Sequence, residues 1–212
     1  MSKGASSERG PQRWSTALLR DVATCFAGLP AAKALSPTAP GGVRVLNLQD
    51  IDATGFINPQ LKEIAPPNGA ARHMVEHGDI LLIARGAQPR TALATESLAG
   101  ALAGPGLLVI RCGPAILAHV LLAYLQSEEG QRALRHRVRG STSTRLLTMK
   151  DIYELSVPVP PIEVQHQIAK LDIAADAAYR TALVAAEKRR ELARTVISQL
   201  LHDDALLGGA PP

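Results

Sequence analysis

The residues whose spacing most resembles a reactive site are His73, Glu76 and His77. They match an H-x-x-E-H pattern, in which two imidazoles one helical turn apart hold Zn²⁺ and the carboxylate polarises water. That geometry needs a sustained helix, but Gly78 and Asp79 follow at once and an apolar run comes next. We therefore expect a solvated turn and no metal site, and a zinc hydrolase is the least favoured of three possible functions.

Other catalytic patterns are missing from the sequence. It contains no phosphate-binding glycine motif and no G-x-S-x-G nucleophile elbow. The hydroxyls near Arg145 lack a base and an orienting acid that the sequence could identify. Cys25 and Cys112 show neither disulfide nor metal spacing, which fits a reducing cytoplasm. We expect no catalytic residue and no cofactor.

A basic segment from Arg132 to Arg145 concentrates groups that bind phosphate. Guanidinium forks and hydroxyls contact phosphate oxygens, and arginine also recognises guanine edges in the major groove. A solvated basic surface has the same composition, and the net charge of +4 does not decide between the two. Arg85 and Arg90 are weaker candidates for base readout. The predicted DNA-contacting residues are Arg85, Arg90, Arg135, Arg137, Arg139, Ser141, Thr142, Ser143 and Arg145.

The sequence that positions these groups has the patterns of both short strands and helices, which predicts an α+β fold. Apolar runs at 80–83 and 107–111 follow glycine-containing turns and predict buried strands. Residues 14–24 are expected to form one short capped element. The Gly- and Pro-rich stretch 28–42 is expected to be a loop that joins no regular strand ladder. A strand is expected to begin at Val43.

The second half of the globular part is predicted to be mainly helical. Pro114 favours a helix that reaches about Gln126, and a basic amphipathic helix continues to Gly140. The prolines within 157–161 predict an extended boundary after it.

A single long helix is predicted from Ile162 to about His202, because this stretch has no Gly or Pro. Its ~40 residues would span ~60 Å, longer than the ~30 to 40 Å diameter of a domain of this size. Apolar side chains recur every three or four residues, which favours a partner helix, although a helix folded back on its own domain has the same period. The predicted partner-facing residues are Val164, Ile168, Leu171, Ala175, Ala178, Leu183, Leu192, Val196, Ile197 and Leu200.

Several segments, in order, resemble the DNA-specificity (S) subunit of type I restriction-modification systems. No single segment is specific, but the ordered set is hard to obtain by chance and covers roughly residues 14–202. The segments are Val45-Leu-Asn-Leu-Gln-Asp-Ile51 with Gly55, Gly78-Asp-Ile-Leu81, Tyr124-Leu-x-Ser127 with Gly130, Gln131 and Leu134, Gly140-Ser141, and VPVPPIEVQHQIA at 157–169. In the last segment, Val164 stands before Gln165 at a position where the family usually has Glu.

The resemblance implies a non-catalytic subunit that binds double-stranded DNA. In the family, a target-recognition domain reads half of a split site, and a long helix sets the spacing and docks adenine methyltransferase subunits. A restriction and translocase subunit can join them. Typical members have two domains and two helices, whereas this sequence has one of each and no internal repeat. It would be a half-length form that homodimerises and reads a split palindrome, with half-sites about one to two DNA turns apart.

The expected organisation is a target-recognition domain over 1–158, a dimerisation helix over 159–203 and a flexible tail over 204–212. The alternative is an interaction adaptor whose coiled coil remains while DNA readout is lost. Steep loss of DNA affinity with salt would separate the two. The N-terminus lacks the apolar stretch of a secretory signal, and the run 115–125 is too short to span a bilayer, so we expect a cytoplasmic protein without a membrane partner.

Overall fold

The computed structural model describes residues 14–34, 38–52, 54–55, 57–58, 60–84, 89–137 and 147–202. The chain forms two compact units, of which the first ends at Ala169 and the second begins at Lys170. The elements are β1 (Ser15–Leu18), α1 (Leu19–Val22), β2 (Ala23–Ala27), α2 (Ala31–Ala34), β3 (Thr38–Leu46), η1 (Leu48–Asp50), β4 (Lys62–Ile64), η2 (Ala70–His73), β5 (Ile80–Ile83), β6 (Arg90–Leu93), η3 (Glu96–Leu98), β7 (Leu102–Ala103), β8 (Leu107–Cys112), α3 (Ala118–Gln126), α4 (Glu128–Arg137), α5 (Met149–Tyr153), β9 (Ser156–Val159) and α6 (Ile162–His202).

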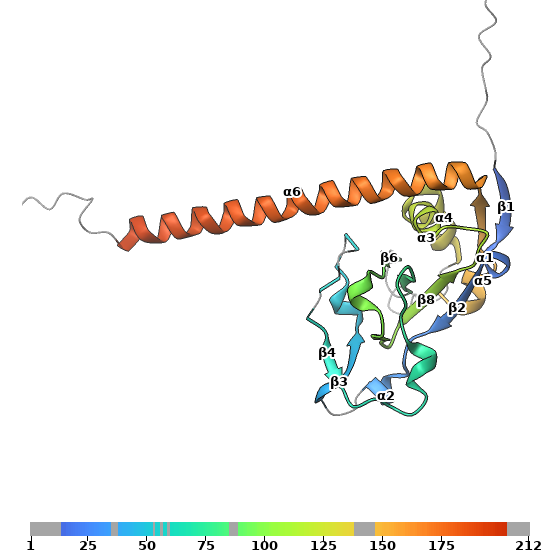
Figure 1. Cartoon of the computed structure of the whole chain (residues 1–212), viewed down its shortest axis with the longest axis horizontal. Coiled ribbons are helices and arrows are strands. Elements are labelled where there is room, and N and C mark those ends of the chain that lie inside the picture. Colours follow the sequence, from blue (N-terminus) through green and yellow to red (C-terminus); the bar gives the residue numbers. More distant parts are fainter. Residues whose placement is uncertain are drawn as a thin grey trace, which may run out of the picture. The chain divides into compact units, whose positions relative to one another are not determined.

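A four-stranded antiparallel sheet with the order β2-β8-β5-β6 forms the centre of the first unit (Figure 1). All four residues of β5 are buried apolar side chains. Ile80 and Leu82 belong to one core cluster with α3, whereas Leu81 and Ile83 belong to a second cluster on the other face. A strand that is covered on both faces has no polar alternation, which is why 80–83 reads as a continuous apolar run.

Two smaller sheets complete the first unit. In one, β1 pairs antiparallel with β9, and in the other the order is β4-β3-β7. Pro158 lies in β9 opposite Thr16 and is tolerated there because β9 has β1 as its one neighbour in the sheet. The proline-rich segment therefore serves as an edge strand before it leads into α6.

β2 is an edge strand, since it pairs with β8 on one side in the described sheet. The side chain of Tyr153 binds backbone groups on its other side. Its hydroxyl accepts from the backbone N–H of Cys25 (3.2 Å) and donates to the Cys25 carbonyl oxygen (3.0 Å). An open strand edge offers unpaired backbone groups to other chains, so this side chain protects the sheet.

The α+β class, the strands at 80–83 and 107–111 and the long C-terminal helix were predicted correctly. The predicted loop 28–42 was wrong, since it contains α2 and the beginning of β3. The pairing of β3 with β4 shifts register between Thr38 and Val43, and Gly41 has a φ of 72° there. A bulge of this kind lets a Pro- and Gly-rich segment join a ladder. Residues 14–24 are not one element but β1, α1 and the start of β2.

The helix α6 runs without a break from Ile162 to His202. Its first turns belong to the first unit, where Gln165 and Ala169 are buried and Ile168 packs against the core. Most side chains after Lys170 are exposed. None of the described helices combines the length and the apolar character that crossing a membrane would require. The predicted tail, 204–212, lies outside the described residues.

Candidate nucleic-acid interface

The basic helix α4 is held at a fixed corner against α3. The Ser127 hydroxyl donates to the carbonyl oxygen of Tyr124 (2.7 Å) and accepts from the N–H of Gly130 (3.1 Å). A Cβ at Gly130 would lie 2.0 Å from that Tyr124 oxygen, so a larger residue does not fit. The Gln131 amide donates to the Leu125 oxygen (2.7 Å). The motif Tyr124-Leu-x-Ser127 with Gly130 and Gln131 thus builds the corner that positions α4.

The arginines of α4 have different surroundings. Arg132 forms an ion pair with Glu128 one turn away (2.7 Å). Arg137 donates to a carbonyl oxygen of its own helix (3.2 Å) and to that of Glu154 (3.0 Å), which ties the ends of α4 and α5 together. Arg135 is exposed, and it makes no hydrogen bond or ion pair with another described residue. Among the arginines of α4, Arg135 is the exposed one for which the described residues provide no hydrogen-bond or ion-pair partner.

Two residues that border predicted DNA-binding segments are hydrogen-bonded to each other. The N–H of Leu147 donates to the oxygen of Ala84 (3.0 Å), and both side chains belong to the same core cluster. Residues 85–88 follow Ala84 and residues 138–146 precede Leu147, and both segments lie outside the described residues. They contain six of the predicted contacts, Arg85, Arg139, Ser141, Thr142, Ser143 and Arg145. The fold therefore brings the attachment points of these segments together, although they are far apart in sequence.

The backbone after Leu147 is fixed by a capping box at the start of α5. The Thr148 hydroxyl donates to the Asp151 carboxylate (2.6 Å), and the backbone N–H of Thr148 donates to the same oxygen (2.9 Å). The Asp151 N–H contacts the Thr148 hydroxyl in return (3.3 Å). Such reciprocal bonds satisfy the first N–H groups of a helix and hold the preceding chain in place.

Arg90 begins β6 and pairs with Ile83 across the β5–β6 hairpin. It is half-buried, and its Nη1 donates to the carbonyl oxygen of Ile51 (3.2 Å). A guanidinium has five N–H donors, so this bond leaves donors for a nucleic-acid contact. Arg90 both fastens the loop at Ile51 and stands at the border of the segment 85–88.

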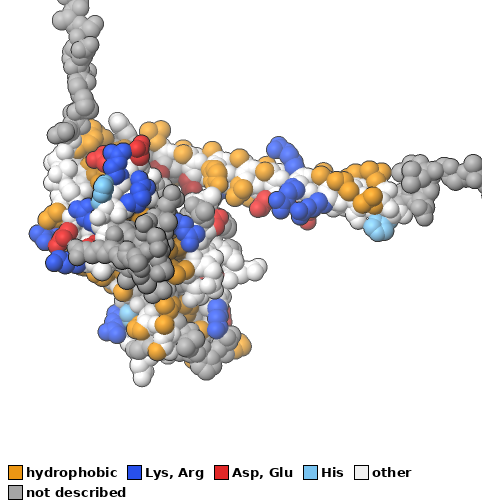
Figure 2. Space-filling model, turned by 180° about the vertical axis from the view of Figure 1, so that it is seen from behind, with side chains coloured by type: hydrophobic (Ala, Val, Ile, Leu, Met, Phe, Trp, Pro, Cys, Tyr) orange, Lys and Arg blue, Asp and Glu red, His pale blue; other side chains and the backbone are white. Residues whose placement is uncertain are grey.

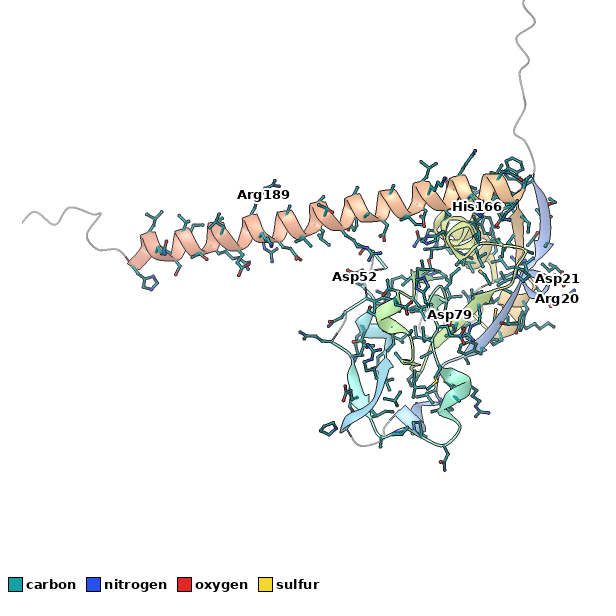
Figure 3. The ribbon with its side chains drawn as sticks, in the orientation of Figure 1. Arg20, Asp21, Asp52, Asp79, His166 and Arg189 are labelled. Atoms are coloured by element: carbon teal, nitrogen blue, oxygen red, sulfur yellow. The ribbon has the colours of Figure 1, made fainter. Side chains whose placement is uncertain are left out.

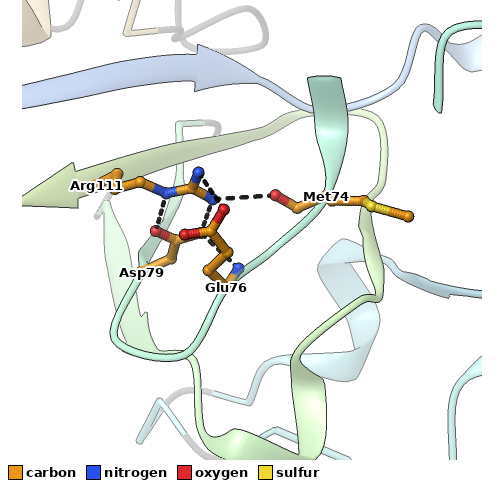
Figure 4. A network of polar contacts seen from close by, with 4 residues as sticks. All are labelled: Met74, Glu76, Asp79 and Arg111. Carbon is orange, nitrogen blue, oxygen red and sulfur yellow. Dashed lines mark hydrogen bonds and ion pairs between the residues drawn. The ribbon is translucent and has the colours of Figure 1, made fainter. Parts of the chain in front are cut away.

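Asp79, part of the motif Gly78-Asp-Ile-Leu81, is a structural residue (Figure 4). Its carboxylate is 1% exposed and accepts two bonds of 2.8 Å from the Arg111 guanidinium. Arg111 also contacts Glu76 (2.6 Å) and the Met74 oxygen (3.2 Å). This bonding with Asp79 raises the pKa of Arg111 above its usual value. The network fixes the turn that leads into β5 against β8.

The zinc pattern does not form a metal site among the described residues. The helix η2 ends at His73, so the three residues do not share a helix. Both ring nitrogens of His73 are engaged within the protein, at 2.9 and 3.1 Å. Glu76 belongs to the Arg111 network, and His77 lies 3.8 Å from Glu96. The residues therefore have separate partners, and the least favoured function has no geometry to support it.

The two thiols are not activated nucleophiles. Burial raises the pKa of Cys25 to about 12, and burial also raises the pKa of Cys112 to about 11. A nucleophilic or metal-binding cysteine needs a lowered pKa, because the thiolate is the reactive form.

Gln165 joins the start of α6 to the segment before α3. It is 2% exposed, and its Oε1 accepts from the Leu117 N–H (2.8 Å). Its Nε2 donates to the oxygens of Ala115 (3.0 Å) and Pro160 (2.9 Å). The glutamine of the family pattern thus has a structural role, which the spacing of residues alone did not indicate. Ile168, predicted to face a partner, instead lies partly buried against the core of its own unit.

Basic side chains gather in small groups with acidic ones between them, rather than in one continuous patch (Figure 2). On the first unit, Arg132, Arg135, His136 and Arg137 follow Glu128 and Glu129 along α4. On α6, Lys188, Arg189, Arg190 and Arg194 lie near Glu187 and Glu191. On the face shown in Figure 2, the described basic side chains therefore offer local phosphate contacts instead of a broad positive field.

Comparison with known proteins identifies solved structures with a similar architecture. No protein-family model matches the chain, and no curated protein matches it. Among solved structures, the HsdS subunit of Thermoanaerobacter tengcongensis is similar, with a TM-score of 0.59 and 19% identity over 95% of this chain and 48% of the other. A chain from a structure of a type I R-M system gives a TM-score of 0.61 and 20% identity over 95% and 49%. The S subunit of the type I system of M. genitalium gives 0.54 and 18% over 85% and 44%.

The chain thus spans about half the length of the solved chains it matches. The similarity covers the globular elements and the long helix together, since it extends over as much as 95% of the sequence. The chain therefore has the α+β fold, with its long C-terminal helix, of about half of a type I restriction-modification S subunit.

Proposed function

We infer that this protein is a half-length specificity subunit, which binds double-stranded DNA in a type I restriction-modification complex. The observation that carries the inference is the shared fold: the globular elements and the long helix together match S-subunit structures over 95% of this chain. Pairing with a second copy would give a complex with two recognition domains. The ordered sequence motifs support the same inference, since two of them build the α3–α4 corner and the buried Asp79–Arg111 pair.

DNA contact is proposed for the surface where α4 ends and the segments 85–88 and 138–146 are attached. Arg135 supplies an exposed guanidinium, and Arg90 stands beside the first segment. Arginine and hydroxyl groups suit this role because they bind phosphate oxygens and base edges. The contacts proposed within the two segments are Arg85, Arg139, Ser141, Thr142, Ser143 and Arg145.

Pairing of two copies is proposed for the second unit. Exposed apolar side chains recur along α6, and Leu171, Leu192 and Leu201 are 72%, 65% and 77% exposed. Such a series on one helix marks an interaction surface. A symmetric dimer would place two recognition domains in inverted orientation, which matches a palindromic site split by a spacer.

The chain is proposed to be non-catalytic and to act in the cytoplasm. Methylation of adenine would belong to methyltransferase subunits, and cleavage to a restriction subunit.

The test is binding of the intact protein to a pool of random-sequence duplexes, followed by fluorescence anisotropy across a salt series. A DNA-binding subunit should bind at 50 mM salt and lose about a hundredfold or more of its affinity by 200 mM, because phosphate contacts release counterions. If no binding occurs at low salt, DNA recognition is refuted and the interaction adaptor becomes the better function.

A further inference from the structure

A loop with a fixed backbone joins η1 to β4, and Asp52 marks its place in Figure 3. Ile51 and Ile57 form an antiparallel bridge, which closes the loop between them. The N–H of Asn58 donates to the backbone oxygen of Asp50 (2.8 Å). The Asp52 carboxylate accepts from the backbone N–H two residues further on (2.8 Å), a bond that stabilises a tight turn.

The same loop is fastened to the start of β6. Arg90 donates from Nη1 to the backbone oxygen of Ile51 (3.2 Å). Gly55, with a φ of 83°, approaches β6 so closely that a Cβ there would lie 2.8 Å from the Thr91 oxygen. Arg90 also borders the segment 85–88, which is attached to the first unit at Ala84. The loop therefore lies beside the surface proposed above for DNA contact.

Two exposed carboxamides follow this loop, on Asn58 and Gln60. The Oδ1 atom of Asn58 accepts from the backbone N–H of Gln60 (3.0 Å), which ties the second residue to the first. The side chain of Gln60 makes no hydrogen bond with another described residue. Its carboxamide is thus held on a fixed backbone with both its donor and its acceptor available.

The chemistry of this carboxamide matches a base edge better than a phosphate. In the major groove, a glutamine can accept from the N6 amino group of adenine and donate to N7 at the same time. The stretch 50–60 contains the carboxylates of Asp50 and Asp52 and has no Lys or Arg. Phosphates would be repelled by these carboxylates, whereas a neutral base edge carries no such charge.

We propose that Gln60 reads an adenine base in the major groove of each half-site, and that Asn58 is its positioning residue. The proposal rests on the DNA-binding function inferred above and adds a residue that determines which base is accepted. Arginines such as Arg135 would contact phosphates and hold the protein on the duplex, while Gln60 selects the base at one position.

The proposal is tested by sequencing the duplexes that the intact protein and Gln60→Ala each select from a random library. The parent should require adenine at one position of each half-site. Gln60→Ala should lower the preference at this position by about tenfold or more, because a good bidentate contact discriminates by about that much. The other positions and the salt dependence of affinity should stay as in the parent, since no phosphate contact is lost.

Controls separate base recognition from folding. Gln167→Ala removes an exposed carboxamide from α6 and should select the parent sequence. Urea unfolding of Gln60→Ala should match that of the parent, because the side chain is exposed and makes no hydrogen bond within the described residues.

Asn58 is tested by a pair of variants. Asn58→Ala removes the oxygen that holds the Gln60 backbone, so it should weaken the preference for adenine at the same position as Gln60→Ala does. Asn58→Asp keeps an accepting oxygen and should retain that preference, even where its added charge lowers the affinity for all duplexes. A merely structural role of Asn58 would not change the choice of base at one position.

The outcomes separate this proposal from the function on which it rests. If Gln60→Ala selects the same bases as the parent, or loses affinity equally for all sequences, the proposal is wrong and the DNA-binding function stands. If the folded parent itself selects no sequence, specific DNA recognition is refuted and the proposal falls with it.

Discussion

The Oε1 atom of Gln165 accepts a hydrogen bond of 2.8 Å from the backbone N–H of Leu117. This contact joins the first turns of α6 to the residue before α3, across a sequence separation of 48 residues. The start of the long helix is consequently part of the globular unit and not a linker. Gln165, together with the buried Ala169 and the partly buried Ile168, holds these first turns in the unit.

Replacing Gln165 by Ala should destabilise the protein by about 1 to 3 kcal/mol, because buried backbone groups lose their partner. Urea unfolding of the full chain measures the change. Gln167→Ala, at an exposed position on the same helix, is the matched control and should cost little. Equal stability of both variants would show that the contacts of Gln165 contribute nothing.

Gly130→Ala should disrupt the corner between α3 and α4. The added Cβ would meet the Tyr124 oxygen at 2.0 Å, and a backbone atom cannot move aside as a side-chain tip can. We expect a loss of several kcal/mol or a folding failure, measured by thermal unfolding, since overpacking and strain act together. Glu129→Ala, an exposed neighbour, should behave like the parent chain. A parent-like Gly130→Ala variant would contradict the packing described for this corner.

Asp79→Asn should cost about 2 to 4 kcal/mol, because it weakens a charge pair whose carboxylate is buried, while the one-third exposure of Arg111 limits the loss. The network also contains Glu76, which is 64% exposed. Glu76→Gln should therefore have a much smaller effect. Denaturant unfolding measures the free energy of unfolding that each variant loses. A larger loss for Glu76→Gln than for Asp79→Asn would refute the structural role given to the buried carboxylate of Asp79.

The native thiols should react slowly. With pKa values of about 12 for Cys25 and about 11 for Cys112, both remain protonated at pH 8. An aromatic disulfide reagent should label the folded protein at least about tenfold more slowly than the urea-unfolded protein, in which thiolates form near pH 8.5. Because the folded pKa values are raised, the thiols favour folding below about pH 8.5, and this contribution is lost as the pH rises through the folded values. Rapid labelling of the native protein would contradict their burial.

Arg135→Ala should lower DNA affinity and reduce the dependence of log affinity on log salt by about 1, if its guanidinium contacts one phosphate. Arg20→Ala is the control, since Arg20 is exposed near Asp21 (3.8 Å) on α1. A larger effect of Arg20→Ala would move the contact surface away from α4. An unchanged salt slope would exclude Arg135 from phosphate contact.

The sequence predicted the elements whose patterns are local. The buried run of β5 and the uninterrupted helix α6 carry their signals within a few residues, so both were found. It did not predict β4, β6, β7 or the early start of β3, because short edge strands depend on partners far away in sequence. The Gly41 bulge is such a case, since it lets a Pro- and Gly-rich stretch join the ladder at Ile64.

The local surroundings of the candidate DNA-binding residues could be predicted from the sequence only in part. Arginine-rich composition directed attention to α4, and Arg135 is exposed there as a DNA contact requires. Composition could not show that Arg137 binds the Glu154 oxygen or that Ala84 and Leu147 are hydrogen-bonded. Asp79 offered a missed signal: a carboxylate before a buried strand requires a cation, and Arg111 lies in the apolar strand β8.

The most direct test of the account is to sequence the duplexes that the intact protein selects from a random library. A paired half-length specificity subunit predicts enrichment of an inverted repeat, whose two halves are separated by unselected base pairs over about one to two helical turns. Enrichment of a single unsymmetrical site, or no enrichment above the input library, would contradict it.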